Sequence, residues 1–223
     1  MRIISKESFT DFVNALIKDS SLNIIGVKAK GGKFAFGPLE SASELRMDYD
    51  VTLLPPKKYY FPQRETLVTY NVGTGFSAKN PSENKPSTVI IGVHPYDIVA
   101  LLHMDEIFSE TKSDLYYFEK RNSSIIIGVN IQKMSKWCFA PYMGTATVEY
   151  GYDLMLTDLG NRYAINIGSP KGEQLLDKYA KNVGNALARD IQLVGQKKRD
   201  VMAMSQQKLD CPTELIPEML SKI

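Results

Sequence analysis

The sequence predicts an α+β fold with a mixed β-sheet, a strand–helix–strand crossover region and a helical C-terminal segment. Two short apolar runs, at 88–93 and 123–130, flank a segment of helical pattern, which is typical of neighbouring buried parallel strands. Two hairpin patterns, at 23–39 and 152–168, predict antiparallel strands. From about residue 170 the apolar period becomes helical.

The first 71 residues predict one helix and several strands. Apolar residues recur at helical spacing over 6–18, and Ser5 is a suitable N-cap. The glycines at 31 and 32 predict the turn of the first hairpin. Residues 47–54 alternate like a strand, and 66–71 predict another.

The rest of the chain predicts a loop followed mainly by helices. The polar segment 75–87, which contains prolines, predicts a surface loop. A helix is expected from about 96 to 103, and a second helical stretch to about 120. Pro170 suits the first turn of a helix that runs through the segment 170–210, and a last helix is expected over 212–222. We therefore expect a mixed core, 1–168, with a helical segment, 169–223, packed on the same domain.

Composition narrows the function classes. The chain has 223 residues, of which 43% are hydrophobic and 23% charged, so wholesale disorder is not expected. A net charge of +2 does not predict nucleic-acid binding. Two cysteines, Cys138 and Cys211, form no disulfide framework, and no apolar run is long enough to span a bilayer. A cytoplasmic protein without a membrane span is expected.

Two histidines raise the question of a metal site. His94 and His103 are nine positions apart, with Asp97, Asp105 and Glu106 nearby in sequence. Such a set could ligate a metal ion, but local helix capping by Asp97 and surface exposure of His103 are favoured.

Other single features carry weaker signals. Cys138 stands in an apolar, aromatic stretch, so packing is favoured over reactivity, and Cys211 begins an expected helix. The basic run "KKRD" at 197–200 predicts a solvated helix face, with docking to an acidic partner as the alternative. "GTGF" at 73–76 is favoured as a simple turn.

The segment "PPKKYYFPQRE" at 55–65 combines basic and aromatic residues. Its three prolines forbid a regular central strand. The aromatics at 59–61 can stack on a flat cofactor or nucleotide base, or they can pack inward while the lysines face solvent. Packing is favoured from the chemistry alone.

Four longer strings together resemble one family. They are "DYDVTLLPPKKYYFPQRETL" at 48–67, "IIGVHPYDIVALLHMDEIF" at 90–108, "CFAPYMGT" at 138–145 and "GYDLMLTDLGNRYAINIGSPKGEQLL" at 151–176. They resemble the N-terminal region of iron–sulfur electron-transfer subunits, typified by those of anaerobic sulfite reductase and by the beta subunit of sulfhydrogenase. The resemblance covers roughly residues 1–220. It implies that relatives continue into a ferredoxin-like domain that binds two [4Fe–4S] clusters, for which this chain lacks the ligands.

The resemblance also implies a lost metal site. In the family pattern, cysteines occupy the positions of Tyr96, Ile131, Cys138 and Ala140, so only Cys138 remains. Iron–sulfur clusters need thiolate donors, and one sulfur cannot hold a cluster. We expect Tyr96 and Ile131 to fill the vacated space, because an apolar void is costly. No metal or cofactor is expected in this chain.

The expected function is therefore that of an accessory or scaffold subunit in a multi-subunit, anaerobic electron-transfer complex. Partner subunits would carry [4Fe–4S] clusters or flavin, and the C-terminal helices and the segment 55–65 are candidate interfaces. One alternative is an iron–sulfur electron carrier whose ferredoxin-like domain lies outside this chain. Another is a flavin- or nucleotide-binding module that uses the turn at 94–97 and the aromatics at 59–61 as one pocket.

Overall fold

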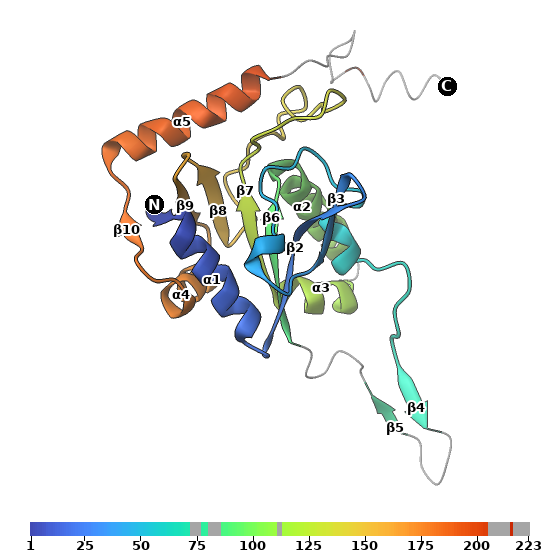
Figure 1. Ribbon diagram of the computed structural model, residues 1–223. Coiled ribbons are helices and arrows are strands. Elements are labelled where there is room, and N and C mark those ends of the chain that lie inside the picture. The colour runs from blue at the N-terminus through green and yellow to red at the C-terminus, as the bar shows by residue number, and fades with distance from the viewer. Residues whose placement is uncertain (72–76, 80–85, 111–112, 205–214, 216–223) are drawn as a thin grey trace.

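The computed structural model describes residues 1–71, 77–79, 86–110, 113–204 and 215. Its fold is α+β, with a mixed eight-stranded sheet in the order β10-β1-β9-β8-β7-β6-β2-β3 (Figure 1). The strands of this sheet are β1 (Arg2–Ser5), β2 (Leu22–Lys30), β3 (Lys33–Pro38), β6 (Ser87–Val93), β7 (Ser124–Val129), β8 (Leu154–Asp158), β9 (Arg162–Ile167) and β10 (Gly184–Asn185). A separate two-stranded sheet joins β4 (Thr69–Asn71) to β5 (Ser77–Lys79). The predicted fold class is confirmed.

The centre of the large sheet is parallel and its edges are antiparallel. Strands β2, β6, β7 and β8 run parallel to one another, while β3, β9, β1 and β10 join through antiparallel pairs. The central strands are buried apolar runs, as expected where both faces of a sheet are covered.

Helices cover both faces of the sheet. They are α1 (Lys6–Lys18), α2 (Pro95–Ser109), α3 (Leu115–Asn122), α4 (Pro170–Tyr179) and α5 (Ala188–Ala203), with short 3₁₀ helices η1 (Ala42–Glu44) and η2 (Pro56–Tyr59). The connection from β1 through α1 to β2 and the one from β6 through α2 to β7 travel in opposite directions along the sheet. Right-handed crossovers in opposite directions place their helices on opposite faces, as Figure 1 shows for α1 and α2.

Local signals explain several boundaries. The Ser5 hydroxyl accepts a hydrogen bond from the backbone N–H of Ser8, so it caps α1 as predicted. Gly31 and Gly32 adopt positive φ angles of 55° and 74° and turn the β2–β3 hairpin, which confirms that prediction. Pro170 occupies the first turn of α4, with Ser169 as N-cap.

The strand predicted over 47–54 is wrong. This segment is irregular and makes only a single bridge, between Thr52 and Phe34, among the described residues. Met47 and Tyr49 are buried there. Their alternation with polar residues follows from inward packing over the end of the sheet and not from strand pairing.

The continuous helix predicted over 170–210 is also wrong. The chain leaves α4 at Ala180, and Asn182 adopts a left-handed φ of 56°. Strand β10 then pairs with β1 before α5 begins at Ala188. The apolar residues on both sides of this break have helical spacing. Pairing of β10 with β1, which lies far away in the sequence, nevertheless replaces the helix there.

Other boundaries shift, and some predictions lie outside the described residues. The helix predicted over 96–103 extends from 95 to 109, and the strand predicted over 66–71 is limited to 69–71. The "GTGF" turn at 73–76, most of the loop at 75–87 and Cys211 lie outside the described residues, as does the helix at 212–222 apart from Leu215. In the described part of the chain, no helix is both long and apolar enough to cross a bilayer.

Candidate functional site

The carboxyl ends of the parallel strands form the candidate site. Strands β6 and β7 are neighbours, so the residues that follow them meet at one edge of the sheet. Tyr96 lies in the first turn of α2, just after β6, and Ile131 lies just after β7. The segment around Tyr49 and Asp50 crosses the same edge.

His94 is fully buried beneath this edge. Its ring stacks on Tyr49, with ring centroids 4.0 Å apart and an interplanar angle of 7°. Its Nδ1 lies 2.7 Å from the Tyr96 hydroxyl oxygen. Burial lowers the pKa of His94 to about 3, so the imidazole is neutral near neutral pH. Its Nε2 has no hydrogen-bond partner among the described residues.

Tyr96 links the start of α2 to the segment near Asp50. Its hydroxyl donates to the carbonyl oxygen of Asp50 at 3.3 Å, which leaves the hydroxyl oxygen to accept from His94 Nδ1–H. Burial raises the pKa of Tyr96 well above its ordinary value, so the phenol stays protonated. A bulky aromatic therefore occupies this turn as a partly buried anchor between α2 and the segment near Asp50.

The four positions inferred from the family resemblance come together. Ile131 and Ala140 are buried, and Tyr96 and Cys138 pack against them in one apolar group, here called the edge cluster, with Met134, Ala146 and Val201. Cys138 is a free thiol. The described residues contain no group of three or more histidine, cysteine or acidic side chains that could hold a metal ion.

A mainly apolar cavity opens beside the edge cluster. This tryptophan cavity has a volume of about 370 Å³, and its lining includes Val51, Tyr96, Trp137, Cys138 and Met143. Trp137 is 68% exposed, and Val51 and Met143 are each about half exposed. The arrangement offers apolar and aromatic contact to another molecule. Trp137 was not singled out from the sequence, although it is the one tryptophan of the chain.

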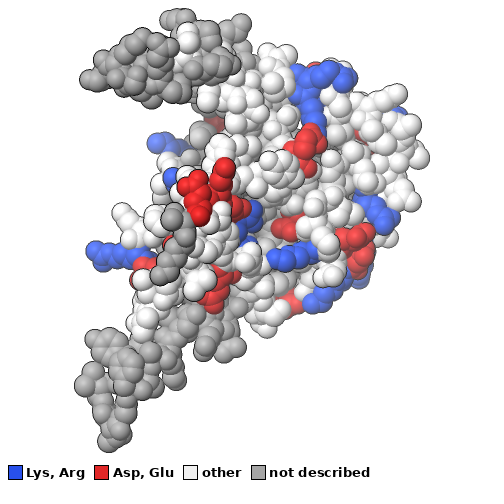
Figure 2. Space-filling model, turned by 180° about the vertical axis from the view of Figure 1, so that it is seen from behind, with Lys and Arg blue, Asp and Glu red and all other residues white. Residues whose placement is uncertain are grey.

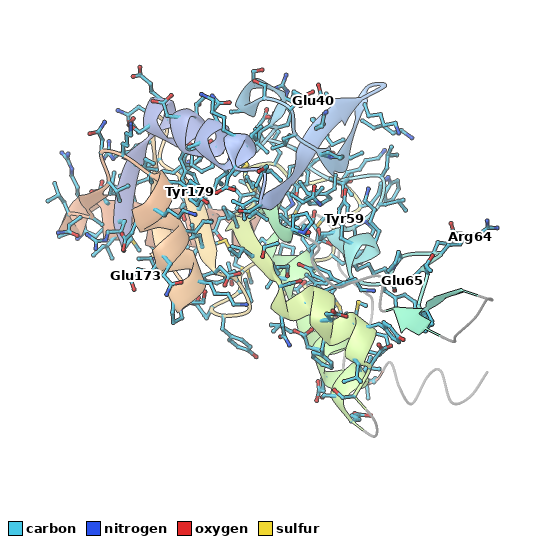
Figure 3. The ribbon with its side chains drawn as sticks, turned by 90° about the horizontal axis from the view of Figure 1, so that it is seen from below. Glu40, Tyr59, Arg64, Glu65, Glu173 and Tyr179 are labelled. Atoms are coloured by element: carbon cyan, nitrogen blue, oxygen red, sulfur yellow. The ribbon has the colours of Figure 1, made fainter. Side chains whose placement is uncertain are left out.

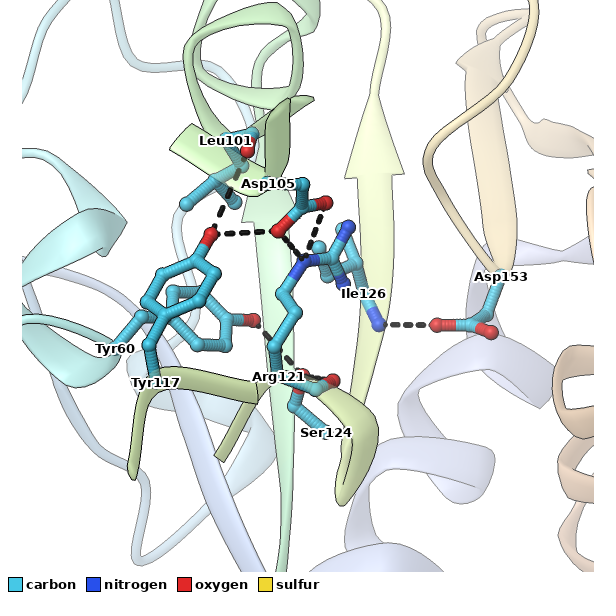
Figure 4. Close-up of polar contacts among 8 residues, drawn as sticks. All are labelled: Tyr60, Leu101, Asp105, Tyr117, Arg121, Ser124, Ile126 and Asp153. Atoms are coloured by element: carbon cyan, nitrogen blue, oxygen red, sulfur yellow. Dashed lines mark hydrogen bonds and ion pairs between the residues drawn. The ribbon is translucent and has the colours of Figure 1, made fainter. Parts of the chain in front are cut away.

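The histidines and acidic residues considered for a metal site are dispersed. His94 is buried, whereas His103 is exposed on α2 and lines a different cavity with Glu106. Asp105 accepts hydrogen bonds from the Tyr117 hydroxyl and from Arg121, as Figure 4 shows. The exposure predicted for His103 is confirmed.

The capping role predicted for Asp97 is wrong. His94 is the N-cap of α2, and no side-chain hydrogen bond caps that helix. Asp97 lies in the first turn instead, where burial raises the pKa of its carboxyl group to about 7. The short connection from β6 into Pro95 places the imidazole where a capping side chain usually lies.

The segment 55–65 divides its aromatics between core and surface. Tyr60 is buried, and its hydroxyl pairs with Ser124 at 3.1 Å (Figure 4). Tyr59 is partly buried and Phe61 is 59% exposed. Arg64 extends away from the body of the fold in Figure 3, whereas Tyr59 lies close to it. The inward packing favoured for these aromatics is therefore confirmed for Tyr60 and wrong for Phe61.

A second cavity lies beside this segment, at the amino ends of β6 and β7. It has a volume of about 500 Å³, and its lining includes Tyr59, Tyr60, Arg64 and Lys120. It shares no lining residue with the tryptophan cavity, which contains Tyr96. The single pocket that the sequence suggested, between the turn at 94–97 and the aromatics at 59–61, is therefore wrong.

The basic run at 197–200 lies on α5. Lys198 pairs with Glu149 at 2.7 Å, and Arg199 donates to Gln196. Lys197 and Asp200 line a third cavity. On the opposite view of the molecule, side chains of both charges are interspersed among uncharged ones (Figure 2). Docking of this run to an acidic partner stays a prediction.

Comparison with known proteins adds one relative. No protein-family model matches the chain. The chain is 26% identical over 173 residues to the sulfhydrogenase 2 subunit beta of Pyrococcus furiosus, a match that covers 78% of this chain and 50% of that protein. The chain thus spans about half the length of the curated relative that it matches. It is similar to a sulfhydrogenase beta subunit.

Proposed function

We propose that this chain is an accessory, non-catalytic subunit of a multi-subunit anaerobic redox complex in the cytoplasm. The similarity to a sulfhydrogenase beta subunit supports a place in such a complex. The observation that carries the accessory role is the edge cluster, where Tyr96, Ile131 and Ala140 pack around the single thiol of Cys138.

The chemistry of the edge cluster supports a structural role. A [4Fe–4S] cluster takes four thiolate ligands, and Cys138 supplies one. The phenol, branched alkyl and methyl groups of the other three positions are not iron–sulfur ligands. Ile131 and Ala140 are 4% and 6% exposed, so packing fills this space.

The tryptophan cavity is the surface that we propose for docking a neighbouring subunit. Interface cores are enriched in tryptophan and methionine, and such residues often carry much of the binding free energy. Trp137 and Met143 present exposed surface around this cavity, whose lining shares Tyr96, Cys138 and Ala140 with the edge cluster. The neighbouring subunits would carry the [4Fe–4S] clusters or the flavin.

Anaerobic purification tests the proposal. The isolated chain should show no iron–sulfur or flavin absorbance and no stoichiometric iron or acid-labile sulfide. About four iron atoms and four sulfides per chain would refute the accessory role.

Copurification from the native host tests the docking surface. Tagged wild-type chain should retain redox subunits, and Trp137→Ala should weaken their binding by about tenfold or more. Tyr150→Ala is the control, because Tyr150 is 70% exposed but lines another cavity. Equal retention by both variants would exclude the tryptophan cavity as the interface.

Restoring cysteines tests whether the edge cluster is a lost iron–sulfur site. The combined Tyr96→Cys, Ile131→Cys and Ala140→Cys variant should bind iron and sulfide on anaerobic reconstitution, because the four positions share one cluster of side chains. No incorporation into a variant that keeps its circular dichroism spectrum would argue against a lost ligand set.

A second candidate is an iron–sulfur electron carrier whose ferredoxin-like domain lies outside this chain. It is favoured by the match to only half of the relative's length. A reading frame that continues into cysteine-rich motifs would support it. A flavin- or nucleotide-binding module is the third candidate, favoured by the cavity of about 500 Å³ beside Tyr59, and yellow flavin absorbance would reveal bound flavin.

A further inference from the structure

We propose that a cavity at the carboxyl ends of β7 and β8 binds a small zwitterionic amino acid with an apolar side chain. The cavity has a volume of about 320 Å³ and lies between these strand ends, the start of α1 and the last turns of α5. This proposal is independent of the redox role. In parallel sheets, ligands bind outside the carboxyl ends of the strands, and this volume suits a small molecule.

Two buried polar side chains line this cavity, here called the Asn130 cavity. Asn130 follows β7 and Thr157 lies on β8, and they are 7% and 4% exposed. The Asn130 amide nitrogen donates to the Thr157 hydroxyl oxygen at 2.8 Å. Within the described residues, the Asn130 amide oxygen and the Thr157 hydroxyl hydrogen have no further partner. Among the described residues, the fully enclosed side-chain atom without a partner is His94 Nε2, so the Asn130 amide oxygen is not enclosed, and a ligand in the cavity can offer it a donor and offer the Thr157 hydroxyl an acceptor.

The charges around the cavity balance. Lys6 pairs with Asp158 at 2.8 Å. Lys197 and Asp200, both on α5, also line the cavity, and the described residues provide neither with an ion-pair partner, although Asp200 accepts a hydrogen bond from Gln196. A simple anion would meet carboxylates, and a simple cation would meet ammonium groups. A zwitterion can satisfy both signs, with its carboxylate near Lys197 and its ammonium group near Asp200.

One wall of the cavity is apolar. Ile131, Val201 and Met204 line it, and Ile131 and Val201 are buried. An aliphatic side chain is the group that gains most from contact with this wall. Ile131 and Val201 also belong to the edge cluster, so the Asn130 cavity and the edge cluster share a wall.

Titration calorimetry on the full chain tests the proposal. L-leucine and L-valine are the probes, and isoamylamine and 4-methylpentanoate are matched molecules that lack the carboxylate or the amine of leucine. We expect saturable binding of at least one amino acid, with each matched molecule at least about tenfold weaker. No saturable binding of either amino acid, or equally tight binding of the matched molecules, would overturn the proposal.

Variants on α5 locate the binding. Lys197→Gln and Asp200→Asn should each weaken binding by about tenfold. Arg199→Gln removes a charge from the same helix outside the cavity and should leave binding unchanged. Thr157→Val removes the buried hydroxyl at nearly constant shape. If Thr157→Val does not fold, the two charge variants still decide, and unchanged affinity in both would exclude this cavity.

Discussion

The Tyr96 hydroxyl gives the sharpest test of the candidate site. Tyr96→Phe keeps the ring and removes the oxygen that contacts His94 Nδ1 at 2.7 Å and the Asp50 carbonyl at 3.3 Å. His94 is fully buried, and its Nε2 already has no partner among the described residues. The substitution would leave both nitrogens of a buried imidazole without a protein partner.

The expected cost follows from that loss. A buried polar group left unpaired costs about 1–3 kcal/mol, so the free energy of unfolding should fall by about 2 kcal/mol. For a domain of this size, about 2 kcal/mol corresponds to a decrease in Tm of about 4–8 °C. The ring still fills its place in the edge cluster, so no cavity adds to the cost.

Urea unfolding monitored by circular dichroism and by fluorescence of Trp137, the single tryptophan, measures the change. Tyr150→Phe removes the same oxygen from a tyrosine that is 70% exposed and should change the free energy by less than about 0.5 kcal/mol. If both variants lose equally little stability, the Tyr96 hydroxyl does not anchor α2 to the segment near Asp50, and this account of the turn is refuted.

Two further predictions concern titration and backbone packing. Protonation of Asp97 (pKa about 7) stabilises the fold as the pH falls and would mask the effect of His94, so the test uses Asp97→Asn. In this variant the free energy of unfolding should fall by about 3 kcal/mol from pH 7 to pH 4. The reason is that the pKa of His94 is lowered from 6.5 to about 3 in the folded state, so in acid the unfolded chain binds a proton that the folded chain does not. A urea midpoint of Asp97→Asn that does not change between pH 7 and pH 4 would contradict this prediction. Gly172→Ala should destabilise by more than about 2 kcal/mol, because its Cβ would lie 2.2 Å from the Asp153 carbonyl oxygen. Gly195→Ala on α5, whose Cβ would meet only an ordinary contact at 3.5 Å, should stabilise by about 0.5–1 kcal/mol. Urea unfolding measures both glycine variants, and equal effects would contradict the packing.

The polar network around Asp105 is not suitable for testing the candidate site. Asp105 bonds to both Tyr117 and Arg121, and Tyr60 pairs with Ser124 close by (Figure 4). Substitution of any member would leave partners unpaired in a part-buried network. A loss of stability there would therefore report on the core and not on the candidate site.

Local sequence by itself determined the elements with strong short-range signals. Ser5 and the apolar spacing over 6–18 placed α1, the two glycines at 31 and 32 placed the first hairpin turn, and the apolar runs placed β6 and β7. In each case neighbouring residues supply the capping bond, the positive φ or the buried face. Such interactions depend only on residues that are close in the sequence.

Only the tertiary structure decided the site. The sequence could not show that Tyr96 bonds His94 and the segment near Asp50, or that 47–54 crosses the sheet edge without joining it. It also could not show that pairing with β1 interrupts the helical pattern near Asn182. These contacts join residues far apart in sequence, and their free energies depend on burial and strand order, which no local pattern contains.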